Sequence, residues 1–285
     1  MGTSTSSSGP SGNIPYDPPW LDRDDMSDGT NQDSTDEQPQ NDESQPDSNT
    51  DALPSNDLAQ PKRLYGAKRN FRNFMKSGSE KALGRALGGY SGKGMGGTSR
   101  FAHRMQRSTT FGAGIYSLFQ DIRSGTSSDP KTKEFIRYLS SGSHSTEEIK
   151  NAVIRHFLPE GGSLDEEASR NSLYQAMSDL AKKPNIDLTK PTEADIWILI
   201  ENFMVYEVIH RVAIDLGQAT ESKSFTPTEV VKRRKEMKAY VRSVMSVEFR
   251  KIKSENRSSI LTSSEMKKLL NSILKETFGV FEGNL

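Results

Sequence analysis

The chain contains no cysteine among its 285 residues. Disulfide bonds, thiolate metal ligands and cysteine nucleophiles are therefore excluded together. It also lacks any apolar run near the ~20 residues that a membrane-spanning helix needs. Its first residues show neither the basic nor the apolar segment of a secretory signal. We therefore expect a soluble, cytoplasmic protein that does not enter a membrane.

Acidic and basic residues are unevenly distributed, although the formal net charge of the chain is zero. Residues 1–60 carry thirteen acidic side chains and one basic side chain, Arg23, whereas residues 61–123 carry thirteen basic side chains and two acidic ones. The remaining residues are nearly balanced, with 24 basic and 23 acidic side chains. The chain is therefore organised in blocks, and the charge of each block has its own physical meaning.

Residues 1–60 are rich in Ser, Asp, Asn, Gln, Pro and Gly. Such a segment cannot bury enough apolar surface to offset its chain entropy, so we expect a long disordered acidic tail. One apolar island, Ile14 to Leu21, interrupts it. Pro19, Trp20 and Leu21 fit a linear docking motif, because proline extends the chain and lowers the entropic cost of inserting the tryptophan. A contact between this island and the protein's own body is the alternative.

Apolar residues recur at helical spacing from Tyr65 onward, and no stretch shows the period-two alternation of a strand. The sequence therefore predicts an all-α, bundle-like body. Composition divides this body into a basic helical segment with a glycine-rich loop over residues 61–125 and a more conventional helical domain over residues 126–285. Within the basic segment, Thr98 is expected to begin one long helix that reaches Ile122.

Two features of the predicted helices bear on how they pack. The helix that Thr192 opens is apolar on several faces between Ile196 and Leu216, so we expect it to be the central one. Gly112 and Gly114 weaken the long helix of the basic segment and allow either a close helix crossing or a bend.

The sequence shows none of the residue spacings that are typical of catalytic or metal-binding motifs. The four histidines show no zinc-binding pattern, and there is no Gly-x-Ser-x-Gly sequence for acyl transfer. Residues 92–97 match Gly-x-Gly-x-x-Gly in letters, but a dinucleotide fingerprint follows a strand and here a helix precedes. We therefore interpret residues 91–97 as a flexible loop between helices, and we expect neither enzyme activity nor a bound cofactor or metal.

Positive charge gives the same region a second interpretation. Lys93 precedes the helix that begins at Thr98, where free backbone N–H groups favour anions, and Arg100, Arg104 and Arg107 are spaced to share one face. These four cations are candidate contacts to phosphate or nucleic acid. The alternatives are a solvated basic face, or a face that pairs with an acidic partner or with the protein's own tail.

The N-terminus presents a glycine in a flexible, uncrowded context. The run from Met1 to Ser6 matches the myristoylation pattern Met-Gly-x-x-x-Ser. A small second residue also permits removal of Met1, which leaves the α-amine of Gly2 partly deprotonated near neutral pH. Such an amine suits an enzyme that modifies protein ends, whereas an inert terminus is the simpler interpretation of these residues.

Several of these segments together resemble a known family. They are the opening Met-Gly-Thr-Ser-x-Ser-x-x-Gly-Pro, the Pro-Pro-Trp-Leu element, the acidic tail, the Arg/Phe-rich helix over residues 67–74, and the segment from Leu87 to Met105 that contains Gly-Gly-Thr-Ser-Arg. In these features the chain is similar to QatB, a component of the bacterial Qat anti-phage system. The resemblance implies three partners from the same operon: an ATPase, an enzyme similar to the QueC nucleobase synthase, and a TatD-like nuclease.

The resemblance also implies roles for individual residues. Related QueC-like enzymes attach a deazaguanine nucleobase to the N-terminal glycine of a partner protein, which makes Gly2 the implied modification site. Thr3, Ser4 and Ser6 are then the implied recognition sequence, and Trp20 is an implied docking anchor. The Ser-rich stretch around Ser6 and the high Asn/Gln content of the tail depart from the family's pattern.

Two functional hypotheses follow from the sequence. The first is a non-catalytic component of an antiviral complex, whose tail presents Gly2 to a nucleobase-transferring enzyme. The alternative is a nucleic-acid-binding adaptor, in which the basic helices of residues 61–125 bind phosphates and the acidic tail competes with them. The alternative predicts salt-sensitive nucleic-acid binding that strengthens when residues 1–60 are deleted.

Overall fold

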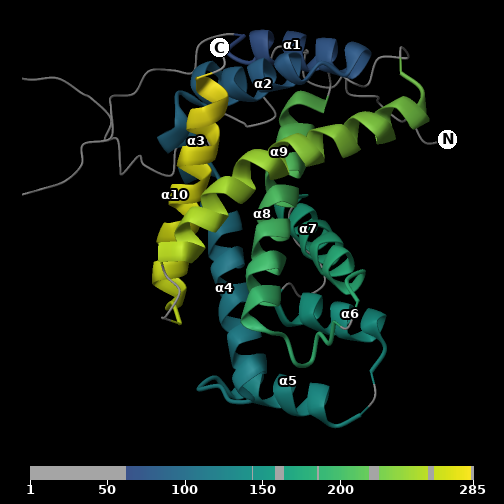
Figure 1. Ribbon diagram of the computed structural model, residues 1–285, viewed down its shortest axis with the longest axis vertical. Helices are drawn as coiled ribbons and strands as arrows, with labels where there is room; N and C mark the ends of the chain where they lie inside the picture. The colour runs from purple at the N-terminus through teal and green to yellow at the C-terminus, as the bar shows by residue number, and fades with distance from the viewer. Residues whose placement is uncertain are drawn as a thin grey trace, which may run out of the picture. The chain divides into compact units, whose positions relative to one another are not determined.

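The computed structural model describes residues 62–283, except for residues 143, 158–163, 185, 218–224 and 256–259. Within these ranges the chain forms ten α-helices and one π-helical segment, and no strand (Figure 1). The all-α prediction is therefore confirmed. Residues 1–60, with the apolar island around Trp20, lie outside the described residues.

The elements follow one another through mostly short connections. Their bounds are α1 (Tyr65–Ser77), α2 (Glu80–Gly89), the π-helical η2 (Tyr90–Gly94), α3 (Thr98–Arg104), α4 (Gln106–Ser124), α5 (Pro130–Ser140), α6 (Thr146–Phe157), α7 (Leu164–Ala181), α8 (Glu193–Leu216), α9 (Pro227–Glu255) and α10 (Ser263–Glu282). Among the residues with described positions, no helix has both the length and the apolar character needed to cross a membrane.

Side-chain caps fix where several helices begin. At the start of α8, Thr192 and Asp195 each bond the other's backbone N–H in a capping box, and Thr262 and Glu265 do the same before α10. Ser145 caps α6 in the same way, through Glu148. Each cap satisfies N–H groups that the first helical turn leaves unpaired. The polar residues at these positions therefore specify where these helices begin.

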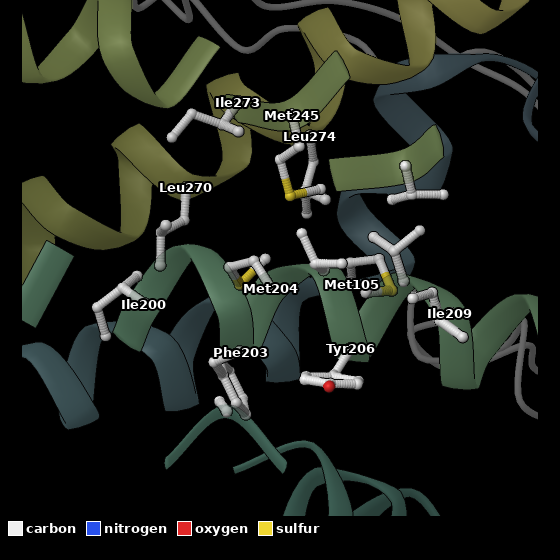
Figure 2. Packing of buried hydrophobic residues seen from close by; sticks show 14 of the residues in the cluster. Met105, Ile200, Phe203, Met204, Tyr206, Ile209, Met245, Leu270, Ile273 and Leu274 are labelled. Atoms are coloured by element: carbon white, nitrogen blue, oxygen red, sulfur yellow. The ribbon is translucent and has the colours of Figure 1, made fainter. Parts of the chain in front are cut away.

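Helix α8 lies at the centre of the body, as its apolar composition predicts. Helices α4, α7 and α9 all pack against it (Figure 1). In Figure 2, Met204 is directed toward Leu270 of α10, whereas Phe203 and Tyr206 leave α8 on the other side. Most residues from Ile196 to Leu216 are buried. A helix that is apolar on several faces is stable only when other helices cover all of those faces.

Glycines allow two of the closest helix crossings, both involving α10. At Gly88 in α2, an added Cβ would lie 2.2 Å from the backbone carbonyl oxygen of Phe281 in α10. At Gly112 in α4, it would lie 2.8 Å from a methyl carbon of Leu270. The sequence allows either a close helix crossing or a bend at Gly112, and the structure shows the close crossing.

The single long helix expected from Thr98 to Ile122 is interrupted at Met105. The ψ angle of Met105 is 10°, so α3 ends before it and α4 begins after it. Its side chain is fully buried, in the core near α8 and α10 (Figure 2). The direction change lets both helices reach this core. The one-helix expectation was wrong because it located the bend only at glycines, whereas long-range packing places it at a buried methionine.

Most of the expected loop at residues 91–97 is helical. Residues 90–94 form η2, which continues directly from α2. The Gly97 N–H donates to the Ser91 carbonyl at 2.9 Å, and positive φ angles of 82° at Gly96 and 108° at Gly97 turn the chain into α3. Glycine adopts such angles without steric strain. The loop interpretation was therefore wrong for the first part of this segment and holds only for its last turn.

The helices of the basic segment and the later helices share one core. Helices α2, α3 and α4 pack against α10, and α4 also packs against α8. Residues 63–285 accordingly form one compact unit. The predicted boundary at residue 125 coincides with the end of α4, where Gly125 adopts a left-handed conformation, but buried side chains on both sides of it belong to the same cluster.

A charged network connects α7, α8 and α9 around Asp179. Its carboxylate accepts hydrogen bonds from Lys238 at 2.5 Å, Tyr206 at 2.7 Å and Lys182 at 3.0 Å, and Arg242 lies 3.7 Å away. Burial opposes ionisation of Asp179, but the hydrogen bonds from these cations and from the Tyr206 hydroxyl outweigh it and lower its pKa to about 2.

The crossing of α2 and α10 leads to a prediction for two adjacent glycines. Gly88→Ala forces two helix backbones apart, so we expect it to lower the free energy of unfolding by about 1–3 kcal/mol. Gly89→Ala is the matched control, because the nearest atoms, in Ala67, would be 3.8 Å away. It replaces a helical glycine without a clash, so it should be neutral or stabilise by up to ~1 kcal/mol. Urea unfolding measures both, and equal midpoints for the two variants would contradict the crossing.

The Asp179 network predicts a pH-dependent loss of stability. A lowered folded-state pKa contributes stability above the ordinary carboxyl pKa, and this contribution disappears as the pH falls toward 2. Asp179→Asn should therefore lower the free energy of unfolding at pH 7 by about 1–2 kcal/mol, a figure reduced for solvent screening. The deficit should shrink below pH 4 in chemical unfolding series. Asp121→Asn is the control, because Asp121 accepts a hydrogen bond from Ser127 and asparagine keeps an oxygen that can accept it. A pH-independent deficit for Asp179→Asn would be inconsistent with the network.

Candidate functional site

A buried carboxyl group lies where α4, α7 and α8 meet. Glu207 of α8 is 6% exposed. Its Oε2 accepts a hydrogen bond from the Ser108 hydroxyl of α4 at 2.5 Å and one from the Ser169 hydroxyl of α7 at 3.2 Å. Three helices that are distant in sequence therefore converge on one ionisable group.

The environment of Glu207 favours its protonated form. Burial raises the pKa of its carboxyl, and the hydrogen bonds from the serine hydroxyls oppose this only in part. Its Oε1 is buried and has no hydrogen-bonding partner in the described part of the chain. A buried polar atom without a partner costs about 1–3 kcal/mol. Perturbed carboxyl groups of this kind are enriched at functional sites, which makes Glu207 a candidate.

A small pit adjoins this carboxyl group. It encloses about 10 Å³, which is space for roughly one water molecule. Its other walls combine charged and apolar side chains, namely Arg107, Phe111, Glu166, Ala168, His210, Arg211 and Ile214. Pockets for cofactors or drug-sized ligands are some hundreds of cubic ångströms. The pit therefore suits a water molecule or a single polar group, not a nucleobase or a nucleotide.

A serine–histidine pair lies close to the pit, but its geometry does not produce a nucleophile. Ser172 Oγ is 2.8 Å from Nδ1 of His210, and the same hydroxyl donates to the Ala168 carbonyl at 2.9 Å. Either atom of the Ser172–His210 contact can be the donor, because the role of Nδ1 depends on the histidine tautomer. Ser172 is also fully buried. This pair fixes α7 against α8 and offers no accessible attacking oxygen.

The structure separates the four cations that the sequence grouped as phosphate contacts. Lys93 is exposed in η2 and Arg100 is exposed in α3, whereas Arg107 is exposed at the start of α4 and lines the pit. Arg104 is directed inward, because its side chain is 15% exposed and lies 3.7 Å from the carboxylate of Asp215 in α8. The bend at Met105 and the burial of Arg104 break the single exposed face.

Asp215 connects the C-terminal end of α8 to η2 as well as to α3. The Tyr90 hydroxyl donates to its Oδ2 at 2.5 Å, and both side chains are buried. Burial, followed by the charge of Asp215, raises the pKa of Tyr90 well above its usual value, so the phenol stays protonated and remains a donor. Arg104 therefore supports a structural contact in which helix α3 is held against α8.

A different set of cations lies on the exposed face of α1. On α1, Tyr65, Arg69, Arg72 and Lys76 are exposed, and they recur at i, i+4, i+7 and i+11. The opposite face of α1 is buried through Ala67, Phe71, Phe74 and Met75. We call these four exposed residues the α1 basic face. The sequence analysis overlooked it, although the spacing of its cations opposite the phenylalanines was a readable signal.

The predicted sites in the tail lie outside the described residues. They are Gly2, Thr3, Ser4, Ser6, Pro19, Trp20 and Leu21. Among side chains with described positions, no group of three or more His, Asp or Glu residues is arranged to hold a metal ion.

The fold and the site define the class of this protein. It is an all-α body built around one buried helix, with a water-sized polar pit and a basic outer helix. A family model described as "Qat anti-phage system associated protein QatB" matches residues 96–281, which is most of this body. The chain belongs to the QatB family and is thus a component of an anti-phage defence system. No match was found among curated proteins or among solved structures.

The family model matches mainly residues after the motifs that carry the resemblance in sequence. Of the quoted motifs, only Gly-Gly-Thr-Ser-Arg and the Arg104–Met105 pair fall within residues 96–281. The match extends instead over the helices from α3 to α10, including those after Pro130 that appear generic in sequence. These helices contribute most of the common core of the body.

The buried carboxyl predicts a pH-dependent stability of opposite sign to that of Asp179. Because the folded-state pKa of Glu207 is raised from 4.5, its favourable contribution is complete at acidic pH and is lost as the pH rises. Glu207→Gln keeps the shape and a carbonyl oxygen, so it should melt above wild type at pH 8, by about 2–4 °C for each kcal/mol gained.

The gain from Glu207→Gln should be smaller at pH 5 than at pH 8, because the protonated fraction of the wild-type carboxyl rises as the pH falls. Thermal unfolding followed by circular dichroism at the two pH values measures the difference. Glu201→Gln is the control, because Glu201 is also on α8 and accepts a hydrogen bond from a serine, Ser246 of α9. A change in melting temperature for Glu207→Gln that is equal at both pH values would contradict a raised pKa for Glu207.

Proposed function

We propose that this QatB-family chain is a non-catalytic component of its defence complex, with Gly2 as the acceptor for a deazaguanine nucleobase. Removal of Met1 frees the α-amine of Gly2, and a QueC-like partner attaches the nucleobase to it. Thr3, Ser4 and Ser6 form the recognition sequence for that partner. The observation that carries this proposal is the Met-Gly start on a chain of the QatB family.

The chemistry of the described helices supports assigning catalysis to a partner. The pit at Glu207 holds about one water molecule and is far too small for a nucleobase. Ser172, whose hydroxyl lies beside His210, is fully buried and offers no accessible nucleophile. The body then acts by binding other proteins, and the partners are the QueC-like enzyme, the ATPase and the TatD-like nuclease of the same operon.

The tail supplies distance and a second recognition point in this proposal. Sixty residues separate the tip from the body, and their polar, acidic composition predicts disorder. A terminus on such a segment reaches an active site without moving the body. Pro19, Trp20 and Leu21 dock on a partner through the tryptophan, since a large aromatic side chain inserted in a pocket dominates binding at small interfaces.

The proposal predicts a modified N-terminus. The chain is co-expressed with the neighbouring genes, and intact-mass spectrometry with sequencing of the N-terminal peptide reads the product. We expect loss of Met1 and an added mass on Gly2. Gly2→Glu retains Met1 and should be unmodified, with loss of protection against phage.

Two controls sharpen this test. Gly2→Ala keeps a small second residue, so Met1 is still removed and the variant shows whether glycine itself is required. Trp20→Ala keeps the acceptor and should reduce the modified fraction rather than abolish it. An unmodified wild-type terminus in the presence of all partners, or full protection by Gly2→Glu, would overturn the proposal.

A further inference from the structure

The α1 basic face consists of Tyr65, Arg69, Arg72 and Lys76 on one side of an amphipathic helix. At about 3.6 residues per turn, positions i, i+4, i+7 and i+11 lie along one stripe. All four side chains are exposed, and Tyr65 has 66% of its surface exposed. A tyrosine that turns away from the core and lies in line with three cations is not needed to hold α1 in place.

The positive charge of this face is not compensated locally. Helix α1 contains no Asp or Glu, and no carboxylate of the described residues pairs with Arg69, Arg72 or Lys76. Like charges at i+3 and i+4 destabilise a helix by ~0.2–0.5 kcal/mol per pair. Surfaces that serve solubility alone intersperse both signs. The face therefore has a composition that suits an anionic partner better than it suits stability.

Helix α9 adds cations at the C-terminal end of α1. Arg233 Nε donates to the Met75 carbonyl at 3.0 Å, and its guanidinium occupies the space where a Cβ on Gly78 would be. Arg233 thereby fixes the first part of α9 beside the end of α1 (Figure 1). Its neighbours Lys232 and Arg234 are both exposed.

Single-stranded nucleic acid is the anionic partner that these residues fit best, and we propose that the α1 basic face binds it. Arg69, Arg72 and Lys76 contact backbone phosphates, and the Tyr65 ring stacks on a base. A track of cations beside an exposed aromatic ring is how proteins bind single strands without reading their sequence. The planar guanidinium of arginine also bonds phosphate oxygens in pairs.

Other anionic partners account for fewer of these features. An acidic protein segment would pair with the three cations but has no use for an exposed Tyr65 in line with them. A membrane surface requires an apolar helix face for insertion, and the apolar face of α1 is buried against the body. In a duplex the bases are already stacked, so a single strand makes fuller use of the tyrosine. The proposal does not depend on the modification of Gly2.

The site differs from the phosphate contacts first expected from the sequence. Those contacts included Arg104, which is largely buried beside Asp215. The α1 basic face lies in the same basic segment of the sequence but on its first helix. It also precedes residues 96–281, the range of the family match.

Fluorescence anisotropy of a labelled 20-nucleotide oligo-dT with the full-length chain tests the proposal. The variant Arg69→Ala/Arg72→Ala/Lys76→Ala changes only exposed side chains, and circular dichroism confirms that it folds. We expect it to lower the affinity at least tenfold at 50 mM salt. It should also reduce the slope of log K against log salt by about 2, since each phosphate contact to a single strand contributes ~0.7.

A matched control removes the same charge elsewhere. Lys133→Ala/Arg137→Ala/Arg155→Ala replaces three exposed cations of α5 and α6, and it should leave binding within about twofold of wild type. Tyr65→Ala should weaken binding roughly tenfold through lost stacking. Tyr65→Phe keeps the ring and should bind like wild type.

Four outcomes would overturn the proposal. The first is absence of binding by the full-length chain at 50 mM salt. The second is an equal loss in the α5/α6 control, which would show general charge attraction. The third is wild-type binding by Tyr65→Ala. The fourth is competition by poly-glutamate as effective as that by unlabelled oligo-dT, which would identify a surface for acidic protein segments instead.

Discussion

The body of this protein depends on the burial of the apolar side chains of helix α8. Most side chains from Ile196 to Leu216 are buried, and α4, α7 and α9 pack against this helix. Each large apolar side chain that is fully buried contributes about 1.5–3 kcal/mol. The same helix carries polar groups, and each is bonded by a particular neighbour: Asn202 by Arg242 of α9, Glu207 by Ser108 of α4, and Asp215 by Tyr90 of η2. Apolar burial thus holds α8 at the centre, while its polar side chains determine which helix lies against which part of it.

The sequence predicts the local features of this fold and misses those that depend on distant contacts. The capping pairs at Thr192 and Thr262 and the all-round apolar character of α8 can be read directly, because they involve neighbours in sequence. The bend at Met105 and the helical form of residues 90–94 cannot, because they result from burial against α8 and α10. For the same reason, the inward direction of Arg104 follows only from Asp215, a residue far along the chain. Glu207 gave no signal either, since its serine partners come from two other helices.

The helices of the family match and the part of the chain before them have different places in the proposed function. Membership of the QatB family is carried by the helices from α3 to α10, which make the core. The groups proposed to meet other molecules lie earlier, at Gly2 and on the α1 basic face. A core that matches the family model, preceded in sequence by the proposed acceptor and the charged face, fits a component that presents groups to partners. Because the pit at Glu207 admits about one water molecule, nothing in its geometry requires the core to hold a substrate.

The central claim is that one core, organised by α8, unites the basic segment with the rest of the body. Native-state hydrogen exchange of the full-length chain over a urea series tests it most directly. The account predicts that amides of α8 exchange slowest, with those of α4 and α10, and only through global unfolding, while α5 and α6 open earlier. Opening of α2, α3 and α4 as a separate unit while α8 stays protected would contradict it, as would exchange of α8 at the rate of α5.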